Sequence, residues 1–394
     1  MRRAGSGSEV HSAVAPQASA ALALTKLRLT NFRSYEDAAL AVESAPVVLA
    51  GANGTGKTNL LEAISLLSPG RGLRGAKLSE IQRKAPEQVG DALWAVAATL
   101  TRPDGQWEIG TGLAPTAPEA REKRLIHLNG AAADSADIAE LLPMLWLTPV
   151  MDRLFLEGAS GRRKFLDRLV FGLHSGHARI VARYERAMRE RLRVLTEGPR
   201  DAAWLDGLEE TMTETGVAVT TARNEAIEKL NGELTARGIA GAFPCAHLAL
   251  EDGCDGIGAN PTKLQAAFAA SRGRDAEAGR TSIGPHLADL LVRHTAKRTD
   301  ARDCSTGEQK ALLISIVLAN AWLQKRKTDD IAPTLLLDEI AAHLDIKRRA
   351  ALFEEILALG AQAWMTGTDM SLFEPLGTHA SRFAVVAGQF VRQE

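Results

Sequence analysis

Eight consecutive residues have the types and spacing that chemistry on a polyphosphate requires. The segment Gly51-Ala-Asn-Gly-Thr-Gly-Lys57-Thr58 matches the P-loop pattern G-x-x-x-x-G-K-[ST]. Its glycines let the backbone turn tightly and bring N–H groups against phosphate oxygens, while Lys57 reaches the β- and γ-phosphates. The Thr58 hydroxyl suits a Mg²⁺ ion. We therefore predict that ATP and Mg²⁺ bind at Gly51, Ala52, Asn53, Gly54, Thr55, Gly56, Lys57 and Thr58.

Two adjacent acids follow an apolar stretch much later in the chain, in the segment Thr334-Leu-Leu-Leu-Asp338-Glu339. The carboxyl end of a central parallel strand lies near the ligand in open α/β sheets. Asp338 is then suited to the Mg²⁺ ion, and Glu339 to orienting or deprotonating the attacking water. Lys57, Asp338 and Glu339 are therefore the expected catalytic residues. The alternative, two solvated carboxylates after an ordinary strand, stays open.

The elements around the P-loop are expected to position it. Residues 24–32 alternate between apolar and polar types, as a half-buried strand does. Residues 45–50 form a short apolar run typical of a buried strand, and residues 57–67 place apolar side chains on one helical face. Strand, glycine-rich loop and helix in this order argue against a chance match to the pattern.

The rest of the chain predicts an α/β fold with a helical insertion. Residues 158–234 read as helices, and the glycines and polar residues over 253–284 predict a loop-rich return. Strands around antiparallel turns are expected first, over 93–100, 107–113 and 124–128. Further strands are expected over 145–147, 290–294, 334–337, 362–366 and 383–386. The later ones alternate with helices, which indicates a mostly parallel sheet. The alternating helices are expected over 307–324 and 346–359.

The helical insertion contains two segments that favour an antiparallel coiled-coil arm. Residues 177–195 are rich in arginine, and Gly198-Pro199 is a suitable turn. The second segment has apolar or small residues at intervals of three and four, namely Leu205, Leu208, Met212, Thr215, Val219, Ala222, Ala226 and Leu230. Two ordinary core helices of a helical lobe remain the alternative.

Composition limits the class of protein. The 394 residues carry 47 Lys+Arg against 48 Asp+Glu, so net charge gives no sign of a polyanionic partner. The three cysteines lack metal-site spacing and fit a reducing cytoplasm, where we expect the protein. No apolar run approaches the roughly 20 residues that cross a bilayer, so no membrane contact is expected. Residues 1–20 are expected to be a disordered leader.

Local basic clusters are the features suited to holding DNA. They lie at Arg71 and Arg74, at Arg162 to Lys164, at Lys347 to Arg349, and on a helical face with Arg179, Arg183, Arg186, Arg189 and Arg193. Such clusters contact phosphates without reading bases. With 5% aromatic residues and no zinc finger, the chain predicts sequence-independent binding. Faces that are merely solvated, with Glu185 and Glu190 as partners, remain equally open.

A second set of motifs resembles the ABC ATPases. Ser305-Thr-Gly307-Glu-Gln309 resembles their signature, and Leu344-Asp345 resembles their D-loop. No histidine occurs at Thr366 to Asp369, where the family carries its switch residue, and no Q-loop glutamine is identified. The resemblance implies a head-to-head homodimer that sandwiches two ATP molecules. Ser305, Gly307, Gln309 and Asp345 would then contact the nucleotide held by a second copy.

Within this class the chain resembles the RecF family of bacterial recombination-repair proteins. The resemblance rests on Asn31 to Tyr35, Asn59 to Ile64, Arg162 to Asp167, Tyr184 to Arg191, and Gly284-Pro285-His286 with Asp289. Leu192 and Leu287 depart from the family's usual Asn and Arg. The resemblance implies a weak, DNA-stimulated ATPase that dimerises on ATP and binds duplex or gapped DNA. It also implies RecR and RecO as partners in recombinase loading during repair and replication-fork maintenance.

The expected organisation is an ABC-type ATPase head over 21–157 and 276–394, with a helical arm lobe over 158–275. Three other functions compete with this interpretation. A transporter's nucleotide-binding subunit would share the P-loop and signature but would not need the helical insertion. An SMC- or Rad50-like clamp would need far longer arms. A scaffold that binds ATP without significant hydrolysis would leave Glu339 without a role.

Overall fold

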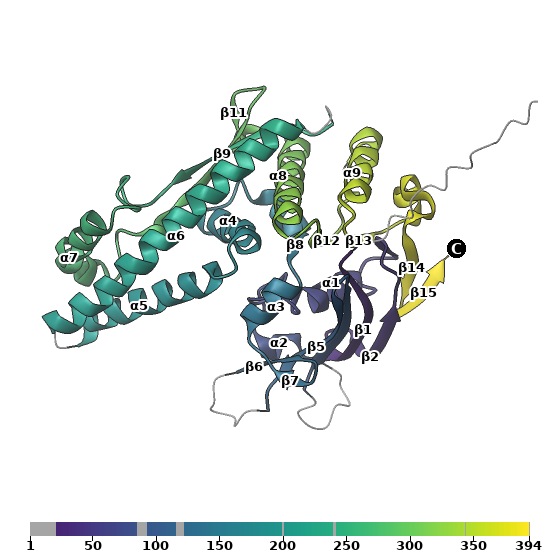
Figure 1. The fold of residues 1–394 in the computed structure, drawn as a ribbon, viewed down its shortest axis with the longest axis horizontal. Coiled ribbons are helices and arrows are strands. Elements are labelled where there is room, and N and C mark those ends of the chain that lie inside the picture. Colours follow the sequence, from purple (N-terminus) through teal and green to yellow (C-terminus); the bar gives the residue numbers. More distant parts are fainter. Residues whose placement is uncertain are drawn as a thin grey trace, which may run out of the picture.

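The computed structural model describes residues 21–84, 93–115, 122–198, 201–238, 242–342 and 344–393. The expected leader, residues 1–20, lies outside these ranges. The described residues form three sheets, two of which lie in a head. An arm of long helices projects from one side of the head (Figure 1). In the described part of the chain, no helix has the length and apolar character that a membrane crossing needs.

The first sheet of the head is antiparallel throughout, in the order β2-β1-β4-β5-β6-β7. Its strands are β1 (Ala23–Phe32), β2 (Tyr35–Ala41), β4 (Ala95–Arg102), β5 (Gly105–Leu113), β6 (Arg124–Leu128) and β7 (Ala131–Ala132). The strand β2 was not predicted from the sequence. It forms a hairpin with β1 through a tight turn in which Asn31 and Arg33 have positive φ angles of 48° and 52°.

The second sheet is mostly parallel, as predicted, in the order β15-β14-β3-β13-β12-β8. Its strands are β3 (Val47–Ala50), β8 (Met144–Leu147), β12 (Thr334–Leu337), β13 (Ala363–Gly367), β14 (Ser381–Val386) and the antiparallel edge strand β15 (Gln389–Gln393). Every residue of β3, β12 and β13 is buried. Because these three strands are parallel neighbours, their carboxyl ends meet at one edge, which brings distant segments of the chain together.

Helices cover the second sheet and connect its strands. They are α1 (Lys57–Ser65), α8 (Thr306–Lys327) and α9 (Ile346–Leu359), and two shorter helices, α2 (Leu78–Ile81) and α3 (Ser135–Leu141), lie beside the first sheet. The helix α9 has the bounds that the sequence predicted. The 3-10 turns are η1 (Pro149–Arg153), η3 (Pro285–Leu287), η4 (Ala301–Asp303) and η5 (Met370–His379).

The arm confirms the predicted helical hairpin. Its helices are α4 (Ala159–Leu173), α5 (His177–Glu197), α6 (Ala202–Arg237) and α7 (Pro261–Ala278). Helices α5 and α6 run side by side in Figure 1, and the seam residues Met212, Val219 and Leu230 are buried. A third sheet of β9 (Ala246–Glu251), β10 (Asp289–His294) and β11 (Thr299–Asp300) lies near the base of the arm.

The prediction of a loop-rich return over 253–284 is wrong, because α7 occupies most of it. The helix begins after Asn260, whose side chain accepts the Lys263 N–H, and ends at Gly279 with a φ of 61°. Its small and polar residues hid the helical period, and only Leu264 and Phe268 are large buried anchors. The expected boundary between arm and head at 275/276 lies within α7.

A buried charge network joins α7 to the hairpin. Arg191 of α5 is fully buried and donates to Glu209 Oε1 at 2.8 Å and to Asp275 Oδ2 at 2.7 Å. It also donates to the Phe268 carbonyl at 2.8 Å. Buried charges are tolerated when they are paired and hydrogen-bonded in this way. The network joins three helices that also share a small apolar cluster, which includes Tyr184, Met212 and Phe268.

Candidate nucleotide-binding site

The P-loop connects β3 to α1, and glycine is needed at two of its positions for different reasons. Gly56 has a φ of 110°, and a Cβ there would lie 2.7 Å from the Tyr35 hydroxyl oxygen. The same hydroxyl donates to the Gly56 carbonyl at 3.0 Å. A Cβ on Gly51 would lie 2.5 Å from the Val385 carbonyl oxygen of β14. The loop is therefore held between the β1–β2 hairpin and β14.

Lys57 is oriented by its own loop and by the acidic strand end. Its Nζ donates to the carbonyls of Gly51 at 2.6 Å and Ala52 at 2.9 Å. The ammonium also lies 3.8 Å from Glu339 Oε1, and the side chain is only 4% exposed. A cation held over the P-loop in this position is suited to the terminal phosphates of a nucleotide.

Thr58 and Asp338 form an oxygen pair that fits Mg²⁺. The Thr58 hydroxyl donates to the two Asp338 carboxylate oxygens at 2.9 and 3.1 Å, and Asp338 is 6% exposed. The described residues contain no group of three or more His, Cys, Asp or Glu side chains able to hold a metal. Mg²⁺ at a phosphate site needs only one or two protein ligands, since phosphates and water supply the others. The donor set therefore fits this ion.

Thr366 is a site residue whose role sequence reasoning missed. From the sequence alone, the end of β13 is notable only as the position where the family's switch histidine is missing. The fully buried Thr366 hydroxyl donates to Asp338 Oδ1 at 2.7 Å and accepts the Glu339 N–H at 2.8 Å. A polar residue at the end of a predicted central strand beside the acidic strand was the available signal. Thr368, the other threonine in the segment where the family carries its switch histidine, is exposed.

Glu339 lies just beyond β12 in an unusual backbone conformation, with a φ of 49°. Positive φ in a residue other than glycine is costly and often occurs at functional sites. The Thr366 hydrogen bond fixes the Glu339 backbone, and the carboxylate stays partly exposed close to Lys57. This position suits a group that orients water attacking a bound phosphate.

The signature segment lies at an accessible helix end. Ser305 precedes α8 and is exposed, and its hydroxyl and N–H donate to Glu308 Oε2 at 3.0 and 3.1 Å. Lys297 pairs with Glu308, and this hydrogen bond, with those from Ser305, lowers the pKa of Glu308 to about 2. Ser305 and Thr306 are exposed and Gly307 is partly exposed, so the start of α8 is accessible to an anion.

The prediction that Gln309 contacts nucleotide needs correction. Its side chain is buried and donates to the carbonyls of Arg302 at 3.3 Å and Cys304 at 2.9 Å. Gln309 thus shapes the signature loop from behind. Asp345 is exposed, and its Oδ1 caps α9 by accepting the Arg348 N–H at 2.9 Å. The following residue, Ile346, is 75% exposed.

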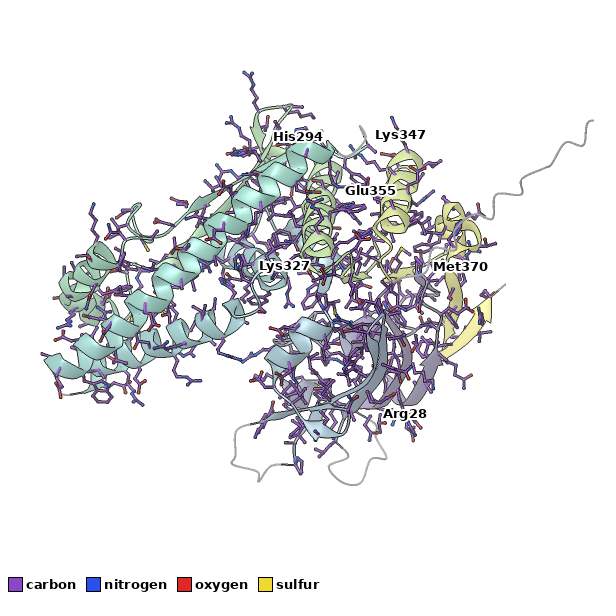
Figure 2. All side chains as sticks on the ribbon, in the orientation of Figure 1. Arg28, His294, Lys327, Lys347, Glu355 and Met370 are labelled. Atoms are coloured by element: carbon purple, nitrogen blue, oxygen red, sulfur yellow. The ribbon has the colours of Figure 1, made fainter. Side chains whose placement is uncertain are left out.

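The basic clusters differ in how freely they present their charge. Arg162 is held by two hydrogen bonds of 2.7 Å to Asp289, and Arg163 donates to the Ala288 carbonyl at 2.8 Å. Arg162 and Arg163 therefore use their guanidinium groups within the fold, while Lys164 of the same cluster is exposed. The arginines on the basic face of α5 are exposed, and four of them have a carboxylate within 4 Å, such as Glu214 at 3.0 Å from Arg183. Lys347 is exposed and lies at the outer end of α9 (Figure 2).

Comparison with known proteins identifies the family of this chain. A family model described as the RecF/RecN/SMC N terminal domain matches residues 23–380. The DNA replication and repair protein RecF of Agrobacterium fabrum is 48% identical over 373 residues, covering 93% of this chain and 98% of that protein. RecF of Rhizobium etli is 48% identical over 375 residues, with the same coverage of 93% and 98%. The chain belongs to the RecF family.

Solved structures support the fold. A recombination mediator protein RecF with ATP, of the RecFOR pathway, has a TM-score of 0.79 at 23% identity and covers 95% of this chain and 99% of its own. The Smc head domain from Pyrococcus furiosus has a TM-score of 0.54 at 16% identity, with coverages of 95% and 96%. The head is thus an ABC-type ATPase fold, as predicted. Membership in the RecF family over nearly the whole chain decides against the transporter alternative.

Proposed function

We propose that the protein is an ATP-dependent DNA-binding protein of recombinational repair and replication-fork maintenance that dimerises when it binds ATP. The observation that carries the proposal is the separation of two phosphate-binding elements within one chain. Ser305 is exposed at the start of α8, and no hydrogen bond in the described part of the chain joins it to its own P-loop. In a dimer, the Ser305 end of α8 from a second copy would contact the nucleotide bound at the first copy's P-loop.

In this proposal the nucleotide joins two heads, and its hydrolysis separates them. Lys57 and the P-loop N–H groups bind the phosphates, and Ser305 and Gly307 of a second copy close over them. Thr58 and Asp338 would hold Mg²⁺, which supplies charge neutralisation at the phosphates. Glu339 orients the attacking water, and Asp345 lies at the edge of the contact between heads. Binding energy from the shared nucleotide then stabilises the closed dimer until hydrolysis removes it.

The closed dimer would hold DNA through phosphates alone, on the side from which the arms project. The exposed arginines of α5 supply positive charge without any base-reading module. Duplex or gapped DNA is the proposed ligand. RecR and RecO are the proposed partners, because a solved relative is described as a recombination mediator of the RecFOR pathway. Their task with this protein would be to load recombinase at gaps.

The test is sedimentation of the full chain with ATP, with ADP and without nucleotide, each with and without gapped DNA. We expect a dimer with ATP only, and Glu339→Gln should hold that dimer closed on DNA because water attack is lost. Lys57→Ala should abolish ATP-dependent dimerisation. A Glu339→Gln protein that stays monomeric with saturating ATP would refute the sandwich arrangement.

A further inference from the structure

The loop that follows α1, residues 68–75, is bordered by arginines that have no carboxylate partner among the described residues. Arg124 of β6 donates to the carbonyls of Gly70 at 2.8 Å and Ser68 at 3.3 Å. From the other side, Arg168 of α4 approaches Gly70, where an added Cβ would lie 3.9 Å from its Nη2. Arg71 is exposed within the loop itself. Arg124 and Arg168, from distant segments of the chain, thus lie beside a short loop that carries Arg71 itself.

The guanidinium group of Arg168 stacks on aromatic rings through its flat face, and its N–H donors lie along its edge. Its Cζ lies 3.4 Å from the centre of the Trp146 ring and 5.7 Å from that of Phe171. A guanidinium stacked on an aromatic ring keeps its N–H donors in the plane, directed away from the ring. No hydrogen bond from these donors is found within the described ranges of the chain. Burial lowers the pKa of Arg168 to about 9, and burial also lowers the pKa of Arg124.

A positive charge that is partly buried without a counterion is costly, so its retention calls for an anion. Arg124 already uses its donors to hold the loop carbonyls. The N–H donors of Arg168, at the edge of the loop, and of Arg71, at its surface, have no hydrogen-bond acceptor within the described residues. The missing acceptor therefore has the chemistry of a phosphate or a similar oxyanion, which binds arginine in a bidentate manner.

The loop is fixed relative to the nucleotide site and to the arm. Its Leu73 N–H donates to Ser65 Oγ at 2.7 Å, and Arg74 pairs with the buried Glu62 of α1 at 2.8 Å. Because α1 begins at Lys57, the loop moves with the P-loop. Helices α1 and α3 face α4 and α5 across the angle between head and arm (Figure 1), and Arg179 of α5 lies 3.7 Å from Asp134, close to α3.

We propose that Arg71 and Arg168, with Arg124 fixing the loop between them, form a phosphate site for the DNA backbone where the arm meets the head. This inference rests on the proposed DNA-binding function and assigns one of its contacts. A free phosphate ion has the same chemistry, so the test must separate it from DNA. The site ties DNA to the helix that carries the P-loop, which none of the exposed α5 arginines does.

The test measures the affinity of the ATP-bound protein for gapped duplex DNA at several salt concentrations, for Arg71→Gln and Arg168→Met. Each variant should bind DNA roughly tenfold more weakly at low salt, since one charge-assisted contact is lost. Each should also lower the slope of log K against log salt by about 1. The matched control is Arg28→Gln, which removes an exposed arginine of β1 on the part of the head away from the arm (Figure 2).

The outcomes separate the two proposals. If the wild-type protein fails to bind DNA with ATP, the proposed function is wrong. If the wild type binds and Arg71→Gln behaves as Arg28→Gln does, only the phosphate site is wrong, and this exposed loop variant does not threaten folding. Loss of inorganic phosphate binding by calorimetry in Arg168→Met, with DNA affinity unchanged, would mean that the site takes a free ion. An Arg168→Lys protein with the same thermal midpoint as Arg168→Met but with DNA affinity restored supports the charge-based role.

Discussion

Replacing Thr366 with valine tests whether the catalytic strand ends are aligned by this buried hydroxyl. Valine keeps the shape of the side chain and removes only its hydrogen bonds, to Asp338 Oδ1 at 2.7 Å and from the Glu339 N–H at 2.8 Å. A hydrogen bond to a charged group contributes about 1.5–3 kcal/mol and a neutral one about 1 kcal/mol. The free energy of unfolding should therefore fall by about 2–4 kcal/mol, measured by urea denaturation without nucleotide.

The same variant should impair turnover more than nucleotide binding. Loss of a residue that hydrogen-bonds to a metal ligand typically reduces metal affinity or activity by about 10–100-fold. We expect single-turnover ATP hydrolysis to slow by about that factor and to require more Mg²⁺, while metal-free nucleotide binding changes little. Thr366→Ser keeps the hydroxyl and should restore the Mg²⁺ dependence. A Thr366→Val protein with wild-type rate and wild-type Mg²⁺ dependence would refute the alignment of Asp338 and Glu339 by this residue.

Three further predictions follow from contacts described above. Arg191→Met should lower the free energy of unfolding by about 3–5 kcal/mol, because Glu209 and Asp275 lose a buried partner; the exposed Arg189→Met control should cost less than about 1 kcal/mol in the same urea titration. Gly56→Ala should lower the thermal midpoint more than Gly54→Ala, since both positions have positive φ but only Gly56 lacks room for a Cβ; equal midpoints would contradict this. The folded-state pKa of Glu308 is depressed to about 2 from an ordinary value of 4.5. The ionised Glu308 carboxylate therefore stabilises the fold fully above about pH 4.5, and this stabilisation is lost as the pH falls toward 2. The difference in free energy of unfolding between wild type and Glu308→Gln, followed by acid titration, should shrink over that range.

The parts of the site that depend on local pattern could be predicted from the sequence. Three parts of the site each lie in one short segment whose residue types indicate their chemistry. They are the P-loop, the acidic strand end and the signature. The structure brings Lys57, Thr58, Asp338 and Glu339 together because β3, β13 and β12 are parallel neighbours. That adjacency is also why Thr366 belongs to the site, although the sequence marks it only as a polar residue at the end of a strand. Only the order of strands in the sheet reveals its contact with Asp338.

The errors have a common physical cause, which is that tertiary partners determine what a polar residue does. Arg162 belongs to a basic run in the sequence, yet Asp289, far along the chain, neutralises it. Gln309 lies within the signature, yet its side chain is directed inward to backbone carbonyls. The helix α7 was missed because its buried face continues beyond Leu264 and Phe268 with Ser271 and Asp275, and Asp275 pairs with Arg191 of α5. Local periodicity contains no information on any of these partners.

Lys310 gives the signature helix a direct connection to the catalytic turn of its own subunit. Its Nζ donates to the carbonyls of Ala342 at 2.8 Å and Glu339 at 3.4 Å, and the helix that carries it begins beside Ser305. In a dimer of the proposed kind, Ser305 would touch the ATP of the neighbouring subunit. A change at one nucleotide would then be transmitted through α8 to the glutamate that acts on the other. The two ATP molecules would be consumed cooperatively, with a Hill coefficient above one, and the pair of heads would open as a single event.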